Sequence, residues 1–131
     1  METQMLNSTH PTTEGQCKTF RQHGHIRLNE VATQDEVSTF REAIRAFVEQ
    51  HSRKVPPLRE RTDTYARAFL QHTNLWELDN MVRQFTTSAR FARIAAELMG
   101  VSGVRLYHDQ ALFKEAGGGH TPWHQDHYYW P

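Results

Sequence analysis

The chain has little cysteine, no excess of either charge and no long apolar run. Among its 131 residues there is one cysteine, Cys17, which cannot form a disulfide within the chain. Its 15 basic and 15 acidic residues cancel, so no positive field is present to hold nucleic acid or an anionic membrane. No stretch reaches the ~18 consecutive apolar residues of a membrane helix, and the N-terminus lacks an apolar signal core. We therefore expect a cytoplasmic protein that binds neither nucleic acid nor membranes.

Apolar residues are scarce as well. They make up 37% of the sequence, whereas nearly half is usual for a self-contained globular domain. Residues 1–16 are rich in Thr, Ser, Asn and Gln and offer little to bury, which predicts a flexible N-terminal tail. A chain of this length can bury one modest core, so residues 17–131 are expected to belong to a single domain.

Two helices are predicted from local signals. The first follows a capping box in which Thr33 caps the third amide and Glu36 reaches back, and apolar residues then recur at helical spacing as far as residue 50. The second runs over residues 88–99, with Ser88 as its N-cap and Gly100 as its C-terminal stop. A short strand is also expected over residues 25–28. The region between the two helices is predicted to be irregular, with short helical turns.

From residue 104 the apolar period changes to two, which indicates a strand. Gln110 and Lys114 fall on the same face of this strand, and neither face is purely apolar, so one face is expected to line a polar cavity. The glycines at 117–119 then turn the chain into a second extended segment that contains His124 and Asp126.

His124 and Asp126 form a His-x-Asp pair. On an extended chain alternate side chains point the same way, so these two lie on one side, ~6–7 Å apart along the strand. An imidazole and a carboxylate placed in this way supply two of the three ligands of a 2-His-1-carboxylate Fe(II) site. Alternatively, the pair only hydrogen-bonds internally, or it joins His120 and His127 in a zinc site. Strand alternation disfavours the zinc site, because His127 points to the opposite side.

The wider pattern resembles the phytanoyl-CoA dioxygenase family of Fe(II)- and 2-oxoglutarate-dependent oxygenases. The resemblance covers residues 20–131 and is most specific near the C-terminal end. It is carried by the capped early helix and by the segments 74–76, 98–100, 108–115, 117–119, 121–126 and 129–131.

The resemblance implies an α+β fold. N-terminal helical segments would precede the first strands of a double-stranded β-helix, or jelly roll, that is apparently truncated. His124 and Asp126 match the first two iron ligands and would be catalytic, while Gln110 and Lys114 would help to bind 2-oxoglutarate. The implied reaction hydroxylates a small organic substrate and decarboxylates 2-oxoglutarate to succinate.

One departure from the family concerns the far end of the site. The distal histidine ligand and the basic residue that pairs with 2-oxoglutarate have no counterpart after Asp126 at the family's spacing. We therefore expect a fragment of a longer enzyme that is inactive alone. The rival interpretation is a truncated, non-catalytic family member that acts as an interaction module or persists as a remnant. Substrate identity and oligomeric state cannot be read from the sequence.

Overall fold

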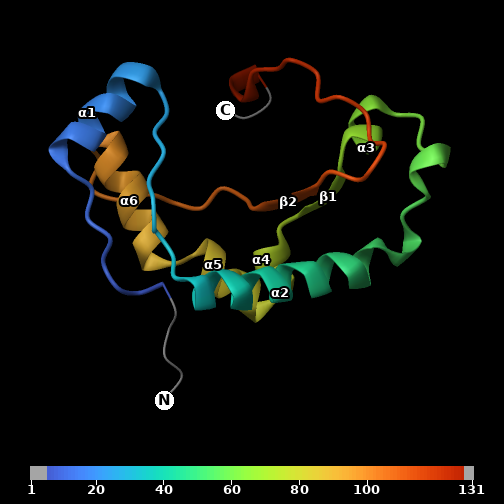
Figure 1. Cartoon of the computed structure of the whole chain (residues 1–131), viewed down its shortest axis with the longest axis horizontal. Helices are drawn as coiled ribbons and strands as arrows, with labels where there is room; N and C mark the ends of the chain where they lie inside the picture. Colours follow the sequence, from blue (N-terminus) through green and yellow to red (C-terminus); the bar gives the residue numbers. More distant parts are fainter. Residues whose placement is uncertain (1–5, 129–131) are drawn as a thin grey trace.

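The computed structural model describes residues 6–128 and has mixed helical and strand structure (Figure 1). The Tyr129-Trp130-Pro131 end of the family pattern and residues 1–5 of the predicted tail lie outside the described residues. The helices are α1 (Glu14–His23), α2 (Gln34–His51), α3 (Thr64–Ala68), α4 (Leu75–Leu78), α5 (Asn80–Thr86) and α6 (Ala89–Met99). The strands are β1 (Leu70–Thr73) and β2 (Gln110–Phe113), and the 3-10 turns are η1 (Ser52–Lys54), η2 (Leu58–Glu60) and η3 (Asp126–Tyr128).

Both predicted helices are confirmed, together with their caps. The Thr33 side chain caps α2 by accepting a hydrogen bond from the Glu36 amide, and the Glu36 side chain accepts one from the Thr33 amide. Ser88 caps α6, which ends at Gly100 in the left-handed conformation. In Figure 1 α2 lies along one edge of the molecule, while α1 and α6 pack together on another side.

The strands β1 and β2 form a two-stranded antiparallel sheet across the middle of the molecule (Figure 1). Its register pairs Gln71 with Leu112 and His72 with Ala111. Because side chains alternate, Ala111 turns toward the core, whereas Gln71 and Leu112 turn toward the opposite face. The core side of the sheet meets side chains from α2, α4 and α5, namely Ile44, Phe47, Val48, Leu75 and Val82.

The predicted strands are longer than those found. Residues 25–28 and 104–109 form no strand, and β2 covers only four residues. The partner strand limits the ladder, because Asn74 takes the left-handed conformation with φ of 55° and α4 starts at the next residue. The His-x-Asp segment is also not a strand: residues 121–125 are irregular, and η3 follows. Two strands do not make a jelly roll, so over residues 6–128 that architecture is not seen.

The predicted flexible tail is packed from residue 6 onward. Leu6 is 1% exposed, and its amide donates to Glu36 Oε1 at 2.9 Å. Thr12 donates its amide to Glu97 Oε2 at 2.9 Å, and Thr13 caps α1. Residues of this segment thus have partners on both helices: Leu6 on α2, and Ser8 and Thr12 on α6. Separately, within the described residues no helix combines the length and apolar character needed to span a membrane.

Candidate metal centre and cavity

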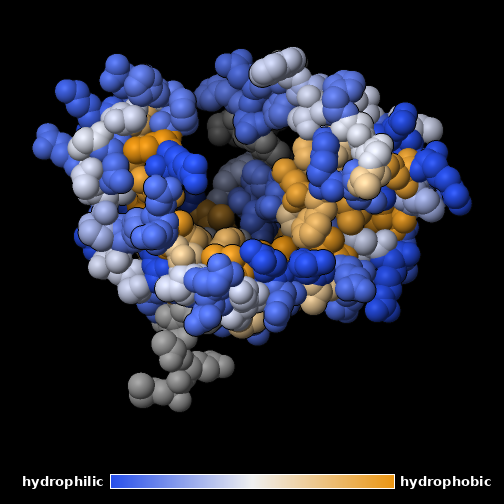
Figure 2. Space-filling view, viewed as in Figure 1, coloured by the Kyte–Doolittle hydropathy of each residue, from blue (hydrophilic) through white to orange (hydrophobic). Residues whose placement is uncertain are grey.

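A cavity of about 580 Å³ lies between the open face of the sheet and the segment that follows the glycine turn. This volume falls within the range usual for small-molecule sites. In space-filling view the molecule is hollowed near its centre, and apolar side chains gather on the right-hand side of the hollow (Figure 2). The cavity is lined by Tyr65, Phe69, Gln71, Gln110, Leu112, Thr121, His124 and Asp126.

His124 and Asp126 meet at this cavity. His124 Nε2 lies 3.5 Å from Asp126 Oδ1, and their side chains are 39% and 78% exposed. The other ring nitrogen of His124, Nδ1, lies 2.8 Å from the carbonyl oxygen of Pro122. A carbonyl can only accept, so Nδ1 donates the proton of this bond, and in the neutral ring Nε2 keeps its lone pair. The main-chain bond therefore leaves the Nε2 lone pair facing the carboxylate, which is the tautomer that a histidine needs to bind a metal through Nε2.

These two donors fit a metal ion. Two ligand atoms that each lie about 2.1 Å from a first-row metal can be separated by at most about 4.2 Å, and the observed 3.5 Å satisfies this. The two atoms are therefore close enough to share a metal ion, although the segment is not extended, and their role as ligands stays a prediction. However, residues 6–128 hold no group of three or more His, Cys, Asp or Glu side chains suited to a metal. The four-residue zinc site is therefore not assembled.

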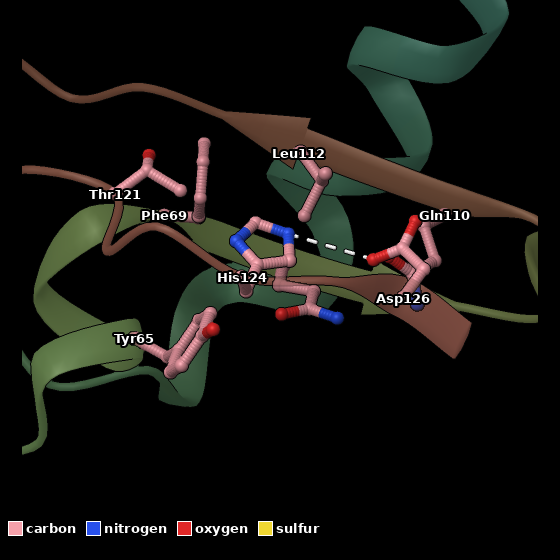
Figure 3. A pocket seen from close by; sticks show the side chains of 8 residues that line it. Tyr65, Phe69, Gln110, Leu112, Thr121, His124 and Asp126 are labelled. Carbon is pink, nitrogen blue, oxygen red and sulfur yellow. Dashed lines mark ion pairs between the residues drawn. The ribbon is translucent and has the colours of Figure 1, made fainter. Parts of the chain in front are cut away.

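The two other predicted site residues differ in position. Gln110 lines the cavity from β2, beside Asp126 (Figure 3). Lys114 does not line it: its ammonium lies 4.5 Å from the ring centroid of Phe69 and donates to Thr121 Oγ1 at 3.3 Å. Lys114 thus contacts two residues that line the cavity, Phe69 and Thr121.

The loop that carries His124 is fastened to the segment around α3. The amide of Gly119 donates to the Arg67 carbonyl at 2.8 Å. At Gly118 a Cβ atom would lie 2.9 Å from the Glu115 carbonyl oxygen and 3.2 Å from that of Arg67, so only glycine allows this close approach. Glu115 also forms a two-pronged ion pair with Arg61, whose side chain is 8% exposed. These contacts hold His124 opposite the sheet.

Comparison with known proteins identifies the family to which the chain belongs. A family model, Phytanoyl-CoA dioxygenase (PhyH), matches residues 20–131. The chain belongs to the phytanoyl-CoA dioxygenase family. Membership indicates an oxidoreductase of the dioxygenase type. Neither the curated proteins nor the solved structures gave a match.

Several residues that line the cavity were not predicted from the sequence. Tyr65, Phe69 and Gln71 reach the cavity from α3 and the start of β1, and Thr121 reaches it from the loop. The Tyr65 ring lies edge-on to His124, with centroids 6.3 Å apart and planes at 72°. For the region that contains Tyr65 and Phe69, the sequence predicts only irregular structure with short helical turns. No local signal marks them, because β1 joins the site by pairing with a strand about 40 residues away.

Proposed function

We propose that the chain carries the first two iron ligands of an Fe(II)- and 2-oxoglutarate-dependent dioxygenase that hydroxylates a small organic substrate. Family membership supports a dioxygenase. The observation that carries the finer proposal is the approach of His124 Nε2 to Asp126 Oδ1, 3.5 Å away, at the wall of a cavity large enough for a substrate.

Each residue has a defined task in this proposal. His124 and Asp126 bind the iron, and the Pro122 carbonyl keeps His124 in the tautomer that leaves Nε2 free. Iron bound with 2-oxoglutarate and dioxygen supplies the oxidising chemistry that the side chains lack. Gln110, beside Asp126, offers an amide to 2-oxoglutarate, and Lys114 keeps the nearby wall in place. The third ligand comes from outside residues 6–128.

Ligand substitution tests the proposed metal site. Mn(II), a paramagnetic substitute for Fe(II), should selectively broaden the NMR signals of residues around His124. His124→Ala and Asp126→Ala should each weaken Mn(II) binding at least ~10-fold, because metal affinity depends on each ligand. His120→Ala and His127→Ala are matched controls and should leave binding unchanged. Equal binding by wild type and His124→Ala would overturn the proposal, and loss in His127→Ala would favour the zinc alternative.

The non-catalytic alternative is favoured by one observation: the described residues supply only two ligands. Succinate production separates the two interpretations. The chain alone, given Fe(II) and 2-oxoglutarate, should form no substrate-coupled succinate, whereas a longer protein that adds a histidine and an arginine should form it. If that longer protein binds iron but forms no succinate with any substrate tested, the interaction-module interpretation takes over.

A further inference from the structure

A groove between α2 and the end of β2 lies on the face of the sheet that is turned away from the cavity. Its volume is about 380 Å³, within the range usual for small-molecule sites. The groove is lined by Val37, Phe40, Arg41, Ile44, Arg45, Phe85 and Phe113. Leu112 and Phe113 are neighbours on β2, and because side chains alternate along a strand, the first borders the cavity and the second the groove. The groove is therefore separate from the proposed metal site.

The floor of the groove is apolar and continues toward the core. Phe40 is 2% exposed, and its ring centroid lies 5.2 Å from that of Phe85. A smaller space of about 110 Å³ adjoins the groove, because Ile44, Phe85 and Phe113 border both. The core residue Leu75 borders this smaller space as well. Two adjoining apolar spaces, the second nearer to the core, suit a flexible hydrocarbon chain.

Two arginines border the groove without a carboxylate partner. Arg41 and Arg45 are exposed and lie four residues apart on α2, where like charges on one helix face repel each other. Glu42 and Glu49 are on the same helix, yet among the described residues neither arginine forms an ion pair. No acidic residue lines the groove. Both guanidinium groups are therefore available to an anion bound there, which would also relieve their repulsion.

We propose that this groove binds a single-chain amphiphile that has an anionic head and a hydrocarbon tail. The head pairs with Arg41 and Arg45. The tail lies against the rings of Phe40, Phe85 and Phe113, where it is removed from water. Charge complementarity favours this ligand over an apolar segment of a partner protein, which would leave both arginines without an anion. The inference goes beyond the proposed function, because it needs neither the metal nor the cavity.

Decanoate is the probe, and decanol, which has a chain of the same length and no charge, is the comparison. In an NMR titration of the full chain at low ionic strength, decanoate should shift the ring signals of Phe85 and Phe113 and bind about fivefold more tightly than decanol. Added salt should remove this preference, because it screens exposed charges. Octanoate should bind about tenfold more weakly than decanoate, since its tail buries two fewer methylene groups.

Charge removal tests the two arginines directly. A variant with both Arg41→Gln and Arg45→Gln should bind decanol as wild type does and should lose the preference for decanoate. Arg53→Gln, at an exposed position outside the groove, is the matched control and should keep the preference. The alcohol and salt comparisons use wild type, so they test the inference even if the double variant does not fold.

Three results would each overturn the inference. Decanol that binds wild type as tightly as decanoate at low ionic strength would mean that the groove recognises apolar surface alone, as a contact with a protein segment does. Decanoate that fails to bind, or that shifts only the Tyr65 and Phe69 signals, would place no amphiphile in the groove. An unchanged preference in the folded double variant would exclude the arginines. None of these results would alter the outcome of the Mn(II) test, which concerns the other face of the sheet.

Discussion

At the residue scale, His72 joins the sheet to the end of α2. Its Nε2 lies 2.7 Å from the Ser52 hydroxyl, and its ring meets His51 edge-on at 6.5 Å. His51 in turn stacks on Phe47 with centroids 3.8 Å apart. Burial lowers the pKa of His72 from its ordinary 6.5, and the charge of His51 lowers it further. His72 is therefore held neutral in the folded protein.

This environment predicts acid sensitivity. Because the pKa of His72 is lower folded than unfolded, its contribution to stability is present above pH ~6.5 and is lost as pH falls below that value. The free energy of unfolding of wild type, measured by urea titration, should therefore decrease from about pH 7.5 to about pH 5.5. His72→Gln should reduce this decrease, while His23→Gln, at an exposed site, should keep it. If the unfolding free energy of His72→Gln decreases with falling pH as steeply as that of wild type, a group other than His72 causes the acid sensitivity.

At the scale of elements, the two long helices were predictable, whereas the length and pairing of the strands were not. The bounds of α2 and α6 were predictable because capping residues lie at their ends. The start of α1 also has a capping box, formed by Thr13 and Gln16, and this helix was not predicted. A strand exists only where a partner is available, and β1 offers four residues.

In the candidate site, too, local sequence patterns indicated some of the residues and not others. His124, Asp126 and Gln110, which the sequence patterns indicated as site residues, all line the cavity, and their roles there stay predictions. The side of the cavity formed by Tyr65 and Phe69 depends on the pairing of β1 with β2 and on the loop that fastens His124 opposite the sheet. Both are long-range contacts, which local sequence patterns do not report.

The fastening of this loop can be tested at Gly118. Gly118→Ala brings a Cβ atom to 2.9 Å from the Glu115 carbonyl oxygen, so the loop must shift away from Arg67. We expect a loss of about 1–3 kcal/mol in stability, together with weaker Mn(II) binding as His124 moves. Gly103→Ala is the control, because no atom lies within 4 Å of its added methyl. Urea unfolding and Mn(II) titration check both variants, and identical behaviour would refute the fastening.

For the whole molecule, one buried ion pair joins segments that are distant in sequence. Arg90 on α6 donates to both carboxylate oxygens of Glu36 on α2, at 2.8 and 3.0 Å. The same guanidinium donates to the carbonyls of Ser8 at 3.0 Å and Val31 at 2.8 Å. The amide of Leu6 completes the group by donating to Glu36. The N-terminal segment is thus part of the fold because an ion pair on two helices binds its backbone.

Removing the charge of Glu36 should therefore loosen the molecule as a whole. Hydrogen bonding from Arg90, aided by the amides of Thr33 and Leu6, outweighs burial and lowers the pKa of Glu36 to about 2. Glu36→Gln leaves Arg90 buried without a counter-charge and should cost about 3–5 kcal/mol near neutral pH. Glu60→Gln, which breaks an exposed pair with Arg59, should cost less than about 1 kcal/mol.

The pH dependence identifies the cause of that loss. A carboxylate whose pKa is lowered on folding stabilises the protein above its ordinary pKa of 4.5, and this stabilisation is lost as pH falls toward 2. The difference in unfolding free energy between wild type and Glu36→Gln should therefore shrink across this interval, as urea titrations at several pH values would show. A difference that stays constant with pH would mean that Glu36 acts through its shape and hydrogen bonds, and that its charge does not hold the N-terminal segment in place.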